Sequence, residues 1–207
     1  MNGLTLYSMP SSGNSYKVRL LLALLRQPYQ HIGLEYETPE LAEAHAKGTL
    51  PLGKLPVLVL PSGEAIPESN AILTYLAEGT DWMPEDAVAR AHVLGWMFWE
   101  QNQHEGVIAV RAALKVYKSR AHLATPERMA ELLEAGHTIL ARMEAHLTSR
   151  YWLVGNVPTV ADISLYAYTH SAGTKGGFDM IRFPAVTAWC DRIADLPGYV
   201  GLMELPE

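Results

Sequence analysis

The sequence predicts an α/β module followed by an all-helical module. In the first eighty residues, short strand-like segments alternate with helix-like ones, a pattern typical of a sheet with helices packed on it. A run of turn-forming residues, 79–84, interrupts this pattern, and beyond it the strand signals stop. We therefore expect a first domain at 1–78, a linker at 79–85 and an all-helical domain at 86–207.

The first module should fold in the order βαβαββα. Its strands are expected where short apolar runs are bounded by turn formers, at residues 4–7, 29–36, 57–60 and 65–66. Its helices are expected at residues 15–26, 39–46 and 68–77. The first of these is indicated by Val18, Leu21, Leu22 and Leu25, which fall on one helical face, and the second opens on Pro39.

The second module should contain four helices. Residues 85–118 keep a helical period without proline, and Gly95 and Gly106 mark places where this long helix can bend. A second long helix is expected at 126–149, with Thr125 as its N-cap and Pro126 in its first turn, and the last helix is expected at 184–194. The third opens at Thr159, where a capping box with Asp162 is predicted because threonine and an acid stand three residues apart.

Composition excludes several classes of protein. The chain has 207 residues, of which 49% are hydrophobic and 18% charged, so a packed core is expected and intrinsic disorder is excluded. Acidic side chains outnumber basic ones in both halves of the chain, and the net charge is −6, so the chain is not expected to bind nucleic acid. The longest apolar run, residues 20–25, is far short of the ~20 residues that span a bilayer. The first residues lack a signal-peptide pattern and Cys190 is the single cysteine, which favours a cytoplasmic setting.

Four segments carry a family resemblance. They are YSMPSSGNSYKVR at 7–19, GKLPVL at 53–58, PESNAI at 67–72 and TVADI at 159–163. In this order the segments resemble the cytosolic glutathione transferase family, and the serine-rich first loop is similar to its bacterial, serine-type classes, such as delta, zeta and nu. The resemblance implies a thioredoxin-like first domain, glutathione as cosubstrate, no metal, a homodimer, and a small hydrophobic electrophile bound against the helical domain.

Ser12 is the first candidate catalytic residue. The glutathione thiol has a reference pKa near 8.5, so an enzyme that uses it must favour the thiolate. A hydroxyl at the N-terminus of a helix does this through a charge-assisted hydrogen bond and through the helix dipole. Ser12 stands where the first helix begins, and by the resemblance it matches the catalytic serine, with Asn14 as a second donor. The alternative is that the loop serines only cap the helix.

Tyr7 is the rival for activating the thiol, because other classes of the family use a tyrosine near the end of the first strand. The long serine-rich loop favours Ser12. Tyr7 is then expected to line the electrophile pocket.

The γ-glutamyl end of glutathione is a zwitterion and needs both an anionic and a cationic partner. Glu68 offers a carboxylate for the ammonium group, while Ser69 and the free amides of a helix N-terminus can receive the carboxylate. The alternative is that Glu68 only complements the dipole of its helix.

The segment around Leu55 and Pro56 should hold the rest of glutathione. The resemblance implies a cis Leu55–Pro56 bond and main-chain pairing of Leu55 with the cysteinyl part, although an X-Pro bond on its own is usually trans. Lys54 is expected to face the glycyl carboxylate, with His45 as a further candidate. The sequence departs from the family at Leu50, where the family usually has asparagine before the proline.

One stripe of the long helix resembles the wall of the family's electrophile pocket. Its members are Glu100, His104, Val107, Ile108 and Arg111. An equally good alternative is a solvated or dimer-facing stripe in which Glu100 pairs with His104 one turn away.

The leading functional hypothesis is a glutathione transferase in which Ser12 holds the thiolate for attack on the electrophile. Three alternatives stay open: a glutathione-dependent isomerase, a glutathione-dependent disulfide reductase or peroxidase, and a non-catalytic glutathione-binding protein. A dithiol mechanism is excluded because the sequence has no Cys-x-x-Cys.

Overall fold

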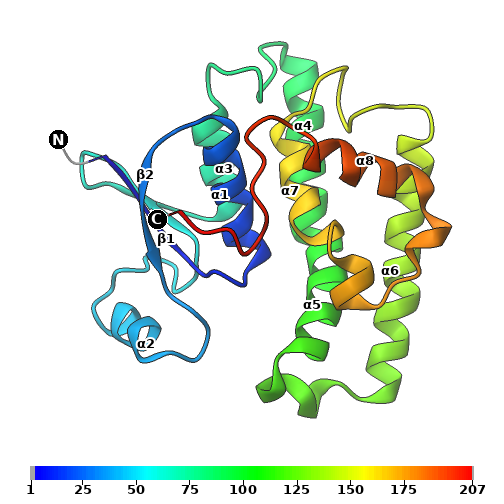
Figure 1. The fold of residues 1–207 in the computed structure, drawn as a ribbon, viewed down its shortest axis with the longest axis horizontal. Helices are drawn as coiled ribbons and strands as arrows, with labels where there is room; N and C mark the ends of the chain where they lie inside the picture. Colours follow the sequence, from blue (N-terminus) through cyan, green and yellow to red (C-terminus); the bar gives the residue numbers. More distant parts are fainter. Residues whose placement is uncertain (1–2, 207) are drawn as a thin grey trace. The chain divides into compact units, whose positions relative to one another are not determined.

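The computed structural model describes residues 3–206, which form two compact units (Figure 1). The first unit comprises residues 3–80 and 196–206, and the second comprises residues 81–195. The first unit contains β1 (Leu4–Ser8), α1 (Gly13–Leu24), β2 (Tyr29–Gly33), α2 (Pro39–Ala46), β3 (Val57–Val59), β4 (Ala65–Pro67) and α3 (Ser69–Ala77). This order confirms the predicted βαβαββα module.

The four strands form one mixed sheet in the order β2-β1-β3-β4. The pair β1–β2 is parallel, whereas β1–β3 and β3–β4 are antiparallel. Such an arrangement is that of a thioredoxin-like fold, and it places the carboxyl end of β1 beside the start of β3, where Tyr7 pairs with Val57. The loop that follows β1 therefore lies next to the segment that precedes β3.

The two faces of the sheet carry separate cores because neighbouring residues of a strand point to opposite sides. Leu6 and Leu58 pair across β1 and β3 and pack with Val18, Leu22 and Ile72, which come from α1 and α3. On the other face, the next pair along, Tyr7 and Val57, packs with residues that include Leu34 and Ala44 of the α2 region. In Figure 1, α1 and α3 lie together beside the strands and α2 lies apart from them.

The second unit is entirely helical, as expected. It contains α4 (Ala87–Trp99), the π-helical η1 (Glu100–His104), α5 (Glu105–Val116), the 3₁₀-helical η2 (Lys118–Leu123), α6 (Pro126–Leu147), α7 (Val160–Thr169), the π-helical η3 (Ala172–Gly176), the 3₁₀-helical η4 (Met180–Arg182) and α8 (Pro184–Ala194). The predicted N-cap Thr125, with Pro126 in the first turn, is confirmed, as is the capping box of Thr159 and Asp162.

The expected long helix at 85–118 is interrupted at a different place from the one predicted. Gly95 and Gly106 lie within α4 and α5, and the irregularity falls between them, in the π-helical turn Glu100–His104. A π-helical turn adds one residue to the turn and so displaces the side chains that follow it around the helix axis. No glycine or proline occurs in this turn, so the sequence offered no local signal for it.

The last residues of the chain pack with the first unit, although the sequence analysis had grouped them with the helical domain. The hydroxyl of Tyr16 donates a hydrogen bond to the Val200 carbonyl (2.8 Å), and Arg19 donates one to the Leu202 carbonyl (2.8 Å). These bonds tie residues 196–202 to α1, and Figure 1 shows this red segment beside the blue helix.

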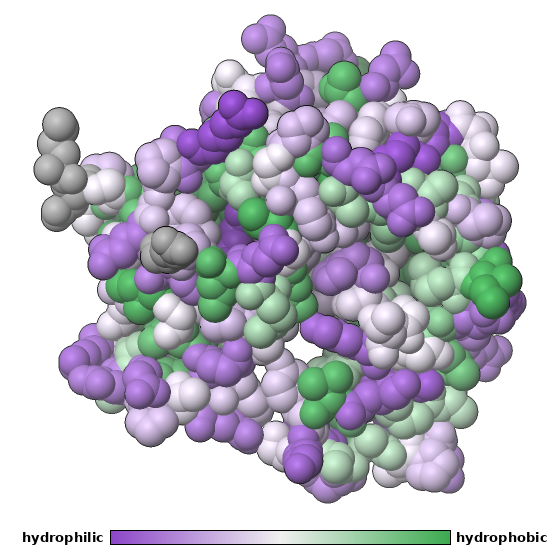
Figure 2. Space-filling model, viewed as in Figure 1, coloured by the Kyte–Doolittle hydropathy of each residue, from purple (hydrophilic) through white to green (hydrophobic). Residues whose placement is uncertain are grey.

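Within residues 3–206, no helix is long and apolar enough to cross a membrane. On the face drawn in Figure 2, hydrophilic and hydrophobic residues are mixed in small patches.

Candidate functional site

Ser12 caps the N-terminus of α1. Its backbone is extended (φ −82°, ψ 131°), and its hydroxyl oxygen accepts a long hydrogen bond from the Ser15 amide (3.4 Å). Since the oxygen is the acceptor in this bond, the hydroxyl hydrogen is free for another partner, and it has no acceptor among residues 3–206. Ser12 thus caps the helix, as the alternative proposed, and still has a donor to offer.

The other two serines of the loop are already occupied or enclosed. The Ser11 hydroxyl donates to one oxygen of Glu35 (2.7 Å), and its amide donates to the other oxygen (3.0 Å). Ser15 is fully buried, and its hydroxyl accepts a hydrogen bond from the Met9 amide (2.9 Å). Of the three serines, Ser12 alone is both accessible and able to donate to a ligand.

The N-termini of α1 and α3 are joined by a side-chain hydrogen bond. The hydroxyl of Ser69, which is 3% exposed, donates to the amide oxygen of Asn14 (3.1 Å). Helix N-termini present free backbone amides and a partial positive charge, so two of them side by side form a place suited to an anion. The structure brings Asn14 and Ser69 together, and Ser12 lies two residues before Asn14.

Glu68 holds an unusual backbone conformation just before α3. It stands at the N-cap position with φ 70° and ψ 117°, makes no capping hydrogen bond through its side chain, and is exposed. A positive φ in a residue other than glycine costs on the order of 1–3 kcal/mol, and such strain clusters at ligand sites. The observed conformation favours a binding role for Glu68 over a capping role.

The segment before β3 carries the remaining predicted binding residues. The Leu55–Pro56 bond is cis, as the resemblance implies. Lys54 and His45 are both exposed, and His45 lies beside this segment, because a Cβ built on Gly53 would be 4.0 Å from its ring. The structure therefore places His45 near Lys54, which spacing alone could only suggest.

Comparison with known proteins decides the family. The model of the glutathione S-transferase N-terminal domain matches residues 6–81, and that of the C-terminal domain matches residues 126–192. A glutathione S-transferase from Xanthobacter autotrophicus is 41% identical, with a TM-score of 0.87 and 96% of each chain covered. The chain belongs to the glutathione S-transferase family.

Two further proteins are similar to this glutathione S-transferase family member over most of its length. A probable maleylacetoacetate isomerase from Caenorhabditis elegans is 27% identical over 202 residues, which cover 94% of this chain and 90% of the relative. A glutathione transferase family member from Pseudomonas fluorescens, solved with two glutathione bound, has a TM-score of 0.86 at 22% identity. Coverage there is 99% of this chain and 94% of that one, and this likeness concerns the fold.

Most of the predicted stripe on the long helix is buried. Glu100 and His104 have no exposed surface and Ile108 is 1% exposed, so the expectation of a solvated stripe is wrong for them. His104 Nε2 lies 2.9 Å from the hydroxyl of Thr169, and Glu100 accepts a hydrogen bond from Ser164 (3.3 Å). These partners come from α7, which the sequence pattern could not place against α4 and α5.

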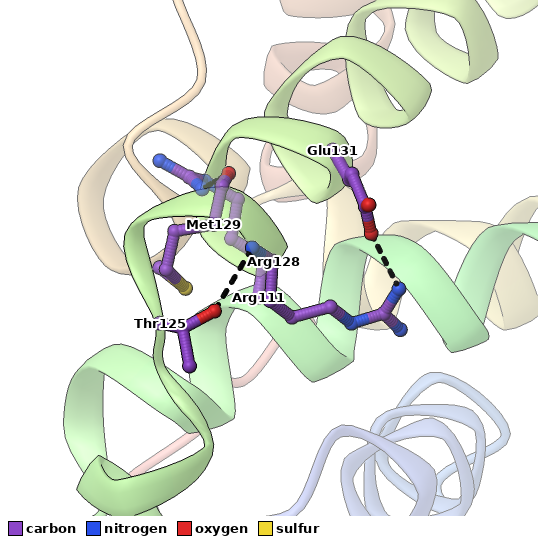
Figure 3. A network of polar contacts seen from close by, with 5 residues as sticks. All are labelled: Arg111, Thr125, Arg128, Met129 and Glu131. Carbon is purple, nitrogen blue, oxygen red and sulfur yellow. Dashed lines mark hydrogen bonds and ion pairs between the residues drawn. The ribbon is translucent and has the colours of Figure 1, made fainter.

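Arg111 is also enclosed within the helical unit. Its Nε donates to the Gly176 carbonyl (2.8 Å), and a second guanidinium nitrogen donates to the Met129 carbonyl. Figure 3 shows Arg111 close to the start of α6, where Met129 lies. Burial lowers the pKa of Arg111. His104, Ile108 and Arg111 thus make structural contacts, and their part in an electrophile pocket stays a prediction, as does that of Tyr7.

A reactive thiol and a group of metal ligands are the other features that could activate a substrate. Burial raises the pKa of the Cys190 thiol far above its ordinary value, which disfavours the nucleophilic thiolate. Over residues 3–206, no three His, Cys, Asp or Glu side chains are grouped to hold a metal ion.

Sequence reasoning missed a buried polar network beneath the Ser12 loop. Arg19, which is 1% exposed, donates to the hydroxyl of Ser8 (2.9 Å), and that hydroxyl lies 2.9 Å from Nε2 of His31. Burial and the Arg19 charge lower the pKa of His31, so its ring is neutral at pH 7 and can accept the Ser8 hydrogen. The signal available was a charged residue within the apolar helix pattern at 18–25.

Proposed function

We propose that this chain is a glutathione transferase in which Ser12 ionises the thiol of bound glutathione for attack on a small hydrophobic electrophile. One observation carries the proposal: among the three loop serines, only Ser12 combines an accessible hydroxyl, an uncommitted hydrogen and a place at the N-terminus of a helix. Family membership supplies the cosubstrate, glutathione.

The proposed activation needs no metal or second thiol. A hydrogen bond from Ser12 to the sulfur favours the thiolate, since bonds to a charged acceptor are roughly twice as strong as neutral ones. The dipole of α1 adds a further 0.3–1 kcal/mol or so. A shift of two pKa units from about 8.5 would require roughly 2.7 kcal/mol, which these two effects together can approach. Asn14 would act as a second donor near the sulfur.

We infer that the rest of the first unit binds the two ends of glutathione. Glu68 would pair with the γ-glutamyl ammonium. The amides at the start of α3 would hold its carboxylate, together with the Ser69 hydroxyl, whose hydrogen would turn from Asn14 to the ligand. Lys54 and His45 would face the glycyl carboxylate, and the backbone of Leu55 would pair with the cysteinyl part. Support comes from the strained, outward-facing Glu68 and from the bond between Ser69 and Asn14.

Glu68→Gln and Ser69→Ala are expected to raise the KM for glutathione with little change in kcat. Both residues would hold the end of the peptide that does not react, so their loss weakens ground state and transition state alike. Steady-state kinetics with varied glutathione checks this, with Glu64→Gln as a control acid on the exposed β3–β4 turn. An unchanged KM for both variants would rule out this binding mode.

A substrate panel distinguishes the proposed activity from its alternatives. Glutathione would be tested with an aryl halide, a hydroperoxide, hydroxyethyl disulfide and maleylacetone. Conjugation of the halide supports the transferase, and turnover of maleylacetone alone would point to the isomerase that the relationship with the Caenorhabditis elegans protein keeps open. Disulfide or hydroperoxide reduction alone, or binding without turnover, would replace the proposed function with the reductase, peroxidase or binding-protein alternative.

We infer further that the protein acts as a two-fold symmetric homodimer. One face of α4 carries an exposed apolar stripe, and its members recur at alternating steps of three and four residues: Val88, Ala91, Gly95 and Phe98. Val88 is 65% exposed and Phe98 is 68% exposed, and their alignment on one helix face is more informative than single exposed apolar side chains would be. This spacing is that of a helix–helix seam, and an identical copy is the commonest partner for such a surface.

Phe98→Glu is expected to convert the dimer into a folded monomer, because a charge would be buried within the seam. Light scattering should give about twice the 22.8 kDa chain mass for the unmodified protein and about one chain mass for the variant. Ile181→Glu is the matched control, since Ile181 is 92% exposed and lies outside the stripe. A stable 22.8 kDa species of the unmodified protein at micromolar concentration would refute the dimer.

A further inference from the structure

The C-terminal segment of the first unit runs along α1 as a strap, defined here as residues 196–202. Two side chains of α1 fasten it: Tyr16 donates to the Val200 carbonyl (2.8 Å) and Arg19 to the Leu202 carbonyl (2.8 Å). The strap also passes close to the helix backbone at Gly198, where an added Cβ would lie 3.2 Å from the Ala23 carbonyl oxygen. Gly198 has φ +94°, a conformation suited to glycine.

Arg19 also forms hydrogen bonds with the loop that carries Ser12. One guanidinium nitrogen donates to the Met9 carbonyl (3.2 Å) and to the Ser8 hydroxyl (2.9 Å), and the other donates to the Pro10 carbonyl (2.9 Å). The Met9 carbonyl also accepts a hydrogen bond from the Ser12 amide (3.1 Å), and this bond closes the turn directly before the helix. One planar group therefore touches both the strap and the turn that sets the position of Ser12.

We propose that Arg19 is a positioning residue for Ser12, and that the strap forms part of the support for the thiol-activating loop. This inference rests on the proposed role of Ser12. Arg19 does not contact the sulfur; it acts through the carbonyls of Met9 and Pro10. Glu35 fixes the adjacent residue of the loop, because its carboxylate accepts hydrogen bonds from the amide and the hydroxyl of Ser11.

The chemistry of the guanidinium explains why arginine fits this place. The two terminal nitrogens of Arg19 donate four hydrogen bonds, all from one rigid plane. The ammonium of lysine, by contrast, is a point charge on a flexible stem. Arg19 is 1% exposed, and its Nε has no acceptor among the described residues. Burying a donor without an acceptor costs free energy, which indicates that arginine serves here for the geometry of its guanidinium. A catalytic donor must be held within about 0.5 Å of its productive position.

The proposal is tested with Arg19→Lys, Arg19→Met and Gly198→Ala, each compared with the unmodified protein. Misplacing a catalytic group by about 1 Å costs up to about 100-fold, so we expect kcat to fall about 10- to 100-fold in all three. The pH profile of kcat/KM should show the thiol ionising at higher pH, while KM for glutathione changes less than about threefold. A structural defect alone would reduce the active fraction without moving the pH profile.

Gly63→Ala is the matched control for Gly198→Ala. Gly63 also has a positive φ (+88°), but an added Cβ there meets no atom within 4 Å, so the substitution introduces backbone strain without touching the strap. If Arg19→Met does not fold, Arg19→Lys and Gly198→Ala still decide the question. Folded variants with unmodified kcat and pH profile would overturn the proposal. If Ser12→Ala itself leaves turnover unchanged, the proposed function fails instead.

Discussion

Ser12→Ala is expected to lower kcat by about 10- to 1,000-fold, the loss typical when one preorganised donor to an anion is removed. The physical reason is that the thiolate would lose a charge-assisted bond that no other serine of the loop can replace, because Ser11 is committed to Glu35 and Ser15 is buried. The pH at which the bound thiol ionises should rise accordingly. Steady-state kinetics with an aryl halide across a pH series measures both quantities.

Tyr7→Phe is the control, because this tyrosine is the rival for the same role. Tyr7 packs on the sheet face that carries Leu34 and Ala44, whereas Ser12 lies at the start of α1. Loss of the Tyr7 hydroxyl should leave kcat within about threefold of the unmodified value, as removal of a single hydrogen bond outside the reacting centre costs little. The opposite pattern, with an inactive Tyr7→Phe and an active Ser12→Ala, would transfer the role to Tyr7.

Asp162→Ala is expected to lower the free energy of unfolding by about 3–5 kcal/mol, because it leaves several buried donors without an acceptor at roughly 1–3 kcal/mol each. Asp162 has no exposed surface, and its carboxylate accepts hydrogen bonds from the Leu153 amide (3.0 Å), the Thr159 amide (2.8 Å) and the Trp189 indole (2.9 Å). Burial raises the pKa of Asp162 and these bonds oppose the rise. Alanine would leave all three donors buried without an acceptor.

Thr159→Ala separates this network from simple helix capping. It removes the hydroxyl that completes the box but leaves the carboxylate with its backbone and indole donors, so a loss of only about 0.5–2 kcal/mol is expected. Denaturant unfolding of both variants measures the difference, and the kcat of the molecules that remain folded should not change. Equal losses in the two variants would mean that Asp162 is a cap and nothing more.

Local rules predicted the parts of the fold that depend on neighbouring residues. Thr125 and Thr159 begin helices because a hydroxyl caps amides only three residues ahead, and the alternation at Leu6 and Tyr7 sends these side chains to the two cores. Ser12 could be chosen for the same reason, since its role depends on the helix that follows it. The cis bond at Leu55–Pro56 was expected from the family resemblance and not from the residue pair.

The features that the sequence could not predict depend on contacts between distant residues. His104 and Arg111 are buried because their partners, Thr169 and Gly176, come from elements sixty-five residues away along the chain. Arg19 meets Leu202 across 183 residues, so no local pattern could assign the strap to α1. The π-helical turn at Glu100–His104 contains neither glycine nor proline, so no residue type marked it in the sequence.

The ultraviolet absorbance of the glutathione thiolate, titrated against pH in the presence of saturating protein, tests the central claim most directly. S-methylglutathione, which has no thiol to ionise, serves as the blank. We predict that the bound thiol titrates about two units below its reference pKa of 8.5, and that Ser12→Ala returns it close to that value. A bound thiol that titrates near 8.5 in the unmodified protein would contradict the account.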